Sequence, residues 1–373
     1  MKILHLLSRL IVGLVFIFSG FVKGVDPLGT AYRIEDYFIA WNAQEMMPYA
    51  LSLSILLSTM EFVLGVVVLL NLKPKVNAWI LLSVMSFFTL LTLNDAIYNP
   101  VPDCGCFGDA ITLTNWQTFY KNVILMVFTL VLLFLRKKTN GVESVLRSYG
   151  TAAAAAIVFV GFSMYNHRHL PVIDFMAWKK GNRMYIENPQ PVKYFLKYRN
   201  KETGEVKEYL SPDYPYNDSV WMSEWEFVDQ RVDDPNQYPG NDLQIMDSTG
   251  TDYTESVIRN PDHQFILVAW DILSANEKAL SRMEAFAAAA ATDGISFVAL
   301  TSSLPEDIEK ARLKLNLSFD IFLSDDIALK TMVRANPGLL LLKDGVVIDK
   351  WHYNDFPRYQ EFTSRYRNAA NGK

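Results

Sequence analysis

The chain has 373 residues, 50% of them hydrophobic and 20% charged, and a formal net charge of −5. Residues 1–165 hold only 20 of the 75 Asp, Glu, Lys and Arg residues, about 12% of that segment, against about 26% of residues 166–373. This division predicts a membrane part followed by a water-soluble part. It argues against a wholly soluble enzyme, and the lack of a basic stripe argues against nucleic acid as a partner. Two cysteines in so long a chain exclude a disulfide-stapled secreted scaffold.

Five apolar runs in the first part approach the roughly 20 residues that a membrane-spanning helix needs. We expect spanning helices at residues 10–21, 50–70, 76–97, 119–135 and 148–165. Lys2 and Arg9 precede the first run, so it is either an anchor or a signal peptide, and the lack of a small-x-small cleavage site favours an anchor. The fifth run is either a span or a buried soluble helix, and we favour the span.

The distribution of Lys and Arg in short loops predicts the orientation of the helices. If the five helices alternate, the basic residues of three segments share one side, which we expect to be cytoplasmic together with the N-terminus. The C-terminal part then lies outside the cytoplasm, beside loops 23–48 and 98–118. The basic residues concerned are Lys2, Arg9, Lys73, Lys75, Arg136, Lys137, Lys138 and Arg147.

Two features of this part are not needed for spanning. Glu61 lies mid-way along the second run, where a charged side chain costs roughly 2.5–3.5 kcal/mol at the bilayer centre. It is either a protonated carboxyl bonded to a neighbouring helix or a proton-handling or quinone-facing group. Residues 34, 37, 38 and 41 (Ile, Tyr, Phe and Trp) form one apolar helical face, expected at the outer interface or as a lid over a site.

Both cysteines, Cys104 and Cys106, lie in one Pro/Gly-rich loop between two expected spans, on the side where disulfides persist. Residues two apart can form a disulfide if the backbone turns, and Gly105 permits such a turn. A bond that closes so short a loop stabilises little and is readily reduced. We therefore expect a redox-active pair. Inert thiols, a soft metal such as Cu(I), and pairing with another chain remain alternatives, although a lone C-x-C is no metal signature.

At these residues the sequence resembles a known family. Residues 11–29, Glu61 with Gly65, and the DCGCFGDAI loop are similar to DoxX-type membrane proteins and to the methylamine-utilisation protein MauE, over residues 1–135. The resemblance implies a helical bundle in a bacterial inner (cytoplasmic) membrane, engaged in thiol or quinone redox chemistry or in maturation of exported disulfide proteins. It implies that Cys104 and Cys106 are the redox pair and Glu61 the intramembrane acid. A quinone is left open as the cofactor.

Residues 167–241 form a polar region in which residues 192–198 and 205–210 are expected to make a β-hairpin. From 242 the expected order is strand, helix, strand, helix, then a short extended piece, a short helix and two strands joined by Asp344-Gly345. This order resembles a thioredoxin-like domain over 242–373, with Pro337 at the position of its cis-proline. Asp271 and Ser274 occupy the two positions of the family's C-x-x-C, so we expect a redox-silent domain in which they act as helix N-caps.

We therefore predict a multi-domain protein: an α-helical transmembrane bundle of five spans (1–166), a polar β-rich region (167–241) and an α/β thioredoxin-like domain (242–373). The leading hypothesis is a membrane-bound thiol–disulfide oxidoreductase. Cys104 and Cys106 would pass electrons between an exported thiol-containing protein and a membrane acceptor, with Glu61 handling a proton. The alternatives are a non-enzymatic assembly or docking subunit that uses the groove near Pro337, and a transport or lipid-related bundle that uses Glu61.

Overall fold

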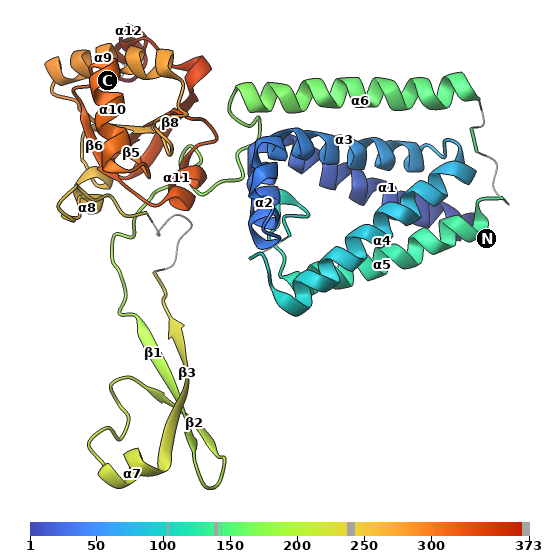
Figure 1. The fold of residues 1–373 in the computed structure, drawn as a ribbon, viewed down its shortest axis with the longest axis horizontal. Helices are drawn as coiled ribbons and strands as arrows, with labels where there is room; N and C mark the ends of the chain where they lie inside the picture. The colour runs from blue at the N-terminus through green and yellow to red at the C-terminus, as the bar shows by residue number, and fades with distance from the viewer. Residues whose placement is uncertain (103, 138–140, 143, 237–242, 368–373) are drawn as a thin grey trace.

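The computed structural model describes residues 1–102, 104–137, 141–142, 144–236 and 243–367. Lys138 and the expected boundary at 241/242 lie outside these residues. Five of the described helices are long and apolar enough to span a membrane, and they coincide with the five runs at which spans were expected. They are α1 (Lys2–Val25), α3 (Ala50–Leu69), α4 (Pro74–Tyr98), α5 (Asn115–Leu135) and α6 (Val145–Arg168). Figure 1 shows them running lengthwise, with α6 along one side of the bundle.

Small residues bring α1 and α3 into close contact. A Cβ atom added to Gly20 would lie 2.6 Å from the backbone nitrogen of Phe62, and one added to Gly65 would lie 2.6 Å from that of Ile17. Only glycine lets two helix backbones approach so closely, as in many membrane helix pairs. This contact fixes the register between α1 and α3, and therefore which of their polar side chains meet.

A short helix, α2 (Pro27–Ala40), crosses one end of the bundle, where it lies between the spans and the C-terminal part (Figure 1). Asp26 caps it by accepting a hydrogen bond from the backbone N–H of Gly29, and Pro27 occupies its first turn. It contains most of the apolar face predicted from the sequence, and it leads through the 3-10 helix η1 (Gln44–Tyr49) into α3.

A three-stranded antiparallel sheet follows the bundle and projects as a separate arm in Figure 1. The predicted hairpin is confirmed by β1 (Lys193–Asn200) and β2 (Val206–Leu210). Strand β3 (Trp225–Asp233), preceded by α7 (Ser219–Glu224), pairs with the other edge of β1. Strand β3 was not predicted from the sequence, because the small core beside it is a cluster of aromatic rings from separate segments rather than a regular apolar pattern.

The C-terminal α/β region contains a five-stranded sheet in the order β6-β5-β4-β7-β8. Strands β4, β5 and β6 are parallel, whereas β7 is antiparallel to both β4 and β8. The expected succession of strands and helices is confirmed, including the Asp344-Gly345 turn, where both residues have positive φ. The strands are β4 (His263–Val268), β5 (Ser296–Thr301), β6 (Asp320–Leu323), β7 (Gly338–Lys343) and β8 (Val346–His352). The helices are α8 (Thr254–Ile258), α9 (Glu277–Thr292), α10 (Pro305–Leu315), α11 (Asp326–Met332) and α12 (Tyr359–Phe362).

Part of the polar region packs onto this sheet. Trp178 and Met184 are 1% and 3% exposed within the core that β4 and β7 share. The backbone N–H groups of Gly181 and Met184 donate to the carbonyls of Val347 and Gly345. The chain therefore returns to the C-terminal sheet directly after α6, before it forms the arm, and this holds the sheet near the end of the bundle.

Candidate functional site

A buried ion pair lies at the α1–α3 contact. The Lys23 ammonium nitrogen is 2.6 Å from Oε1 and 2.8 Å from Oε2 of Glu61, and both side chains are 5% exposed. The site residue Glu61 therefore has a cationic partner that the sequence analysis did not assign. In the sequence, Lys23 is a cation close to the end of an expected span, a feature that many residues at the membrane surface share.

The two thiols face each other in the loop between α4 and α5. Their sulfur atoms are 2.9 Å apart, both cysteines are free and both are partly buried. Gly105 has a φ of 59°, and a Cβ atom there would lie 2.9 Å from Cγ of Arg33. Glycine is thus required between the cysteines for two reasons, the left-handed turn and the close approach of Arg33. A disulfide bond of about 2.05 Å needs only a small closure from this geometry.

The thiols are not equivalent. The pKa of Cys106 is lowered to about 6, chiefly because the Cys104 thiol donates a hydrogen bond to its sulfur, with Lys121 and Lys23 adding positive charge nearby. The pKa of Cys104 is raised, because the proton it donates to Cys106 is held in that bond and because it is buried. Cys106 is therefore the thiolate of the pair at neutral pH, and Cys104 keeps its proton.

Ser19 of α1 connects the ion pair to the cysteine loop. Its hydroxyl oxygen is 2.8 Å from Oε2 of Glu61 and 2.7 Å from the carbonyl oxygen of Cys106. The hydroxyl has one hydrogen, so it donates either to the Glu61 carboxylate or to the Cys106 carbonyl, and its oxygen also accepts from the Lys23 ammonium at 3.3 Å. The three residues selected from the sequence, Cys104, Cys106 and Glu61, thus belong to one site, joined by a serine that the sequence did not single out.

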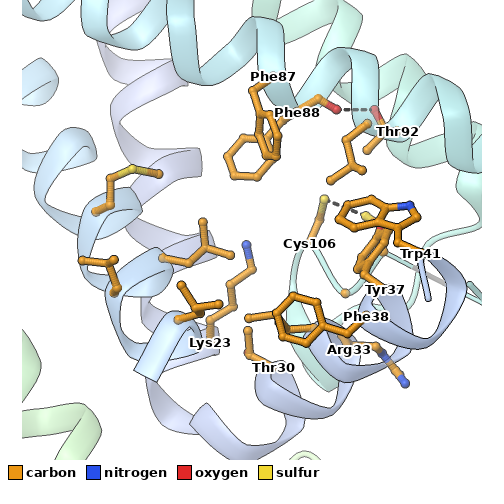
Figure 2. Close-up of a pocket in the computed structure, with 18 residues that line it drawn as sticks. Lys23, Thr30, Arg33, Tyr37, Phe38, Trp41, Phe87, Phe88, Thr92 and Cys106 are labelled. Atoms are coloured by element: carbon orange, nitrogen blue, oxygen red, sulfur yellow. Dashed lines mark hydrogen bonds between the residues drawn. The ribbon is translucent and has the colours of Figure 1, made fainter. Parts of the chain in front are cut away.

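An apolar pocket of about 320 Å³ opens beside the thiols, between α2, α3 and α4. Figure 2 shows the Lys23 amine and the Cys106 sulfur pointing into it, with aromatic rings of α2 and α4 around them. The predicted apolar face of α2 contributes Ile34, Tyr37 and Phe38 to the wall, and Trp41 follows directly. The Tyr37 hydroxyl donates to the buried Asp95 carboxylate of α4 at 2.6 Å, which holds α2 against the bundle.

A guanidinium from the C-terminal region closes the outer side of this site. The Arg334 Nε donates to Asp26 at 2.7 Å, and its Nη2 donates to Asp109 at 2.8 Å. Asp109 follows the cysteine pair by three residues, and its carboxylate also lies 3.6 Å from Arg33. The Arg334 side chain is 6% exposed, and its pKa is raised because the two carboxylates outweigh the cost of burial. One buried cation therefore joins α2, the cysteine loop and the α/β region.

Asp271 and Ser274, which occupy the positions of the C-x-x-C in the resemblance, make polar contacts instead of a thiol pair. Asp271 accepts hydrogen bonds from the backbone N–H groups of Leu273 and Ser274, and Asn336 donates to Ser274 Oγ. The expectation that Asp271 and Ser274 cap the following helix is wrong, because α9 begins at Glu277 and Asn276 is its cap. The Asn336–Pro337 bond is cis. Within the described residues, no group of three His, Cys, Asp or Glu side chains is arranged to hold a metal ion.

Comparison with known proteins covers the helical part. Residues 1–135 match the family model of the methylamine utilisation protein MauE, a membrane family, which supports a membrane accessory role. That match contains four of the five spans, the cysteine loop and Glu61. Comparisons with curated proteins and with solved structures gave no match.

Proposed function

We propose that the protein is a membrane-bound thiol–disulfide oxidoreductase that passes electrons from exported thiol proteins to a membrane acceptor through Cys104 and Cys106. The observation that carries this is the sulfur pair at 2.9 Å, with the pKa of Cys106 lowered to about 6. Inert structural thiols need neither the contact nor the charge around Cys106. Low-pKa, partly accessible cysteines are typical of redox-active sites.

The asymmetry of the thiols suggests the order of steps. A substrate thiolate attacks Cys104 of the loop disulfide, and Cys106 leaves as the thiolate, because a thiol of lower pKa leaves faster. A second substrate thiolate then attacks the substrate sulfur of the mixed disulfide, so the substrate departs oxidised and the loop holds the Cys104 thiol and the Cys106 thiolate. The acceptor removes two electrons and the Cys104 proton from this pair, which restores the bond.

The C-terminal region acts in this proposal as a thioredoxin-like domain without thiols that positions the substrate. Its strand order, with β4 and β5 parallel in the centre and β7 and β8 antiparallel beside them, supports that assignment. The connection between α3 and α4, which contains Lys73 and Lys75, lies at the bundle end opposite to this region, and α5 ends there as well (Figure 1). By the charge rule, this supports a cytoplasmic N-terminus and an exported C-terminal region.

Single-cysteine variants test the relay. Neither Cys104→Ser nor Cys106→Ser can form the loop disulfide, so each should lose the relay. In membranes with the wild-type chain, mixed disulfides with exported proteins, trapped by acid and alkylation and mapped by peptide mass spectrometry, should involve Cys104 far more than Cys106. The redox state of the wild-type pair is read by an alkylation mass shift before and after mild reduction. The double variant is the matched control, because the chain has only two cysteines. Two permanently free thiols in the wild type, or full function of both single variants, would reject the relay.

The non-enzymatic docking role remains the second candidate, but the groove near Pro337 gives it little support. Arg334, three residues before that proline, is already buried against Asp26 and Asp109 of the same chain. A partner on this face would have to displace a charge network that the chain itself satisfies.

A further inference from the structure

The pocket beside the cysteines has the properties of a site for a lipid-soluble aromatic ligand. Its volume of about 320 Å³ is at the lower end of the range for small-molecule sites. Its surface is mostly apolar, with rings from Phe38, Trp41, Phe87 and Phe88 on opposite sides (Figure 2). Such walls favour a flat hydrophobic ring over a polar metabolite, because a polar group would lose its hydration without finding partners.

The pocket is reached from the lipid side. Leu56 of α3 and Phe87 of α4 line it and are 65% and 58% exposed. Both helices are membrane spans, so the surface that these residues expose faces acyl chains. The opposite wall is closed by the cysteine loop and α2, which lie under the α/β region. A ligand carried in the bilayer can therefore enter between α3 and α4 with its tail left in lipid.

The wall of the pocket farthest from the lipid carries the groups that could react with a ligand. Cys104 and Cys106 both line the pocket, and the Lys23 ammonium faces the same space. An acceptor bound here contacts the sulfur pair without crossing protein or water. Lys23, which is paired with Glu61 behind it, makes this wall the polar end of the pocket, opposite the apolar mouth between α3 and α4.

We propose that the pocket binds a quinone whose ring is reduced by the Cys104–Cys106 dithiol; this inference rests on the proposed function. In the step, the Cys104 S–H bond breaks and one S–S bond forms between the two cysteines, which releases two electrons. The quinone takes up these electrons, and its two oxygens become the hydroxyls of the quinol with the proton of Cys104 and a second proton from water, because the Cys106 thiolate carries none. Neither a metal nor a further oxidant is required.

Two measurements on the full chain in nanodiscs test the site, with decylubiquinone as the probe. The first is binding, read as a thermal shift, since a ligand specific for the folded state stabilises it. The Cys104→Ser/Cys106→Ser double variant should still be stabilised, because binding does not need the thiols. The second is oxidation of the reduced cysteines, followed by quinone absorbance and alkylation mass shift.

A neighbouring pair of substitutions gives the matched control. Leu91→Trp fills the pocket, whereas Leu90 is 67% exposed on the same helix and outside the pocket, so Leu90→Trp leaves it open. Leu91→Trp should abolish the thermal shift and slow quinone reduction roughly a hundredfold, the scale expected for misplaced reactants. It should leave oxidation of the cysteines by the water-soluble oxidant diamide unchanged, and Leu90→Trp should behave as wild type.

If Leu91→Trp reduces the quinone at the wild-type rate, the pocket is not the quinone site. So would a wild-type protein whose cysteines cycle with diamide but neither bind nor reduce decylubiquinone, in which case the pocket holds only lipid chains. Cysteines that form no bond with any oxidant would instead reject the proposed function itself, and the quinone reaction with it.

Discussion

The lowered pKa of Cys106 depends on side chains that surround its sulfur. A cysteine alone in a loop titrates near 8.5. Here the adjacent thiol and two lysines stabilise its thiolate, while burial and Glu61 oppose this. The sequence predicted a pair but not its asymmetry, because Lys23 and Lys121 come from different helices. Their distance from the sulfur depends on how α1 and α5 pack, which no local pattern encodes.

The thiol asymmetry predicts a pH profile for alkylation of the reduced protein. Only the thiolate reacts, so the rate at Cys106 should rise as the pH passes about 6 and level off above it. Cys104, with its raised pKa, should stay nearly unreactive over that range. Peptide mass spectrometry after iodoacetamide treatment measures both rates.

Variants at the donor position serve as controls for this profile. Cys104→Ala removes the hydrogen-bond donor and should move the Cys106 midpoint upward, whereas Cys104→Ser keeps a hydroxyl donor and should move it less. A wild-type midpoint near 8.5, the ordinary thiol value, would contradict the assignment of Cys106 as the thiolate.

At the scale of elements, the α1–α3 contact determines where the site forms. Gly20→Ala places a methyl group against the α3 backbone, which overpacks the contact and should cost about 1–3 kcal/mol. Gly161→Ala on α6 is the matched control, since no heavy atom lies within 4 Å of its added Cβ. Thermal unfolding in detergent should show a clear loss for Gly20→Ala and none for Gly161→Ala. Equal stability of the two variants would mean that α1 and α3 are not held by this contact.

The helices and strands were largely predictable from the sequence, whereas the contacts between them were not. Long apolar runs and the Asp344-Gly345 turn are local signals, so the spans and the succession of C-terminal strands followed from them. Strand β3 and the packing of Trp178 under the sheet depend on partners far along the chain. Similarly, the cysteines and Glu61 were visible as unusual residues, whereas Ser19, Lys23 and Arg334 gain their roles only from tertiary contacts.

At the scale of the whole molecule, Arg334 joins the two parts of the chain. Removing one partner of a buried charge pair typically costs about 3–5 kcal/mol, whereas an exposed pair contributes about 0–1 kcal/mol. Arg334→Gln should therefore lower the unfolding temperature and speed proteolysis between the bundle and the α/β region. Lys314→Gln, which breaks an exposed pair with Glu277, should do neither.

A compensating variant makes this test specific. In Arg334→Gln the carboxylates of Asp26 and Asp109 lose their buried partner. Adding Asp26→Asn and Asp109→Asn removes those charges and should recover part of the lost stability. If the triple variant is no more stable than Arg334→Gln alone, the charge network does not hold the two parts together.

Arg334 is synthesised long after the bundle that it contacts, so the site is completed in two stages. The helical bundle, with Asp26 and Asp109, is complete at residue 168, but Arg334 leaves the ribosome 166 residues later. At about 5–20 residues per second, this interval lasts roughly 8–33 s. Throughout it, the cysteine loop lies uncovered at the end of the bundle, open to whatever oxidant or reductant the compartment provides. The loop can thus react with that oxidant or reductant before the domain that covers it exists.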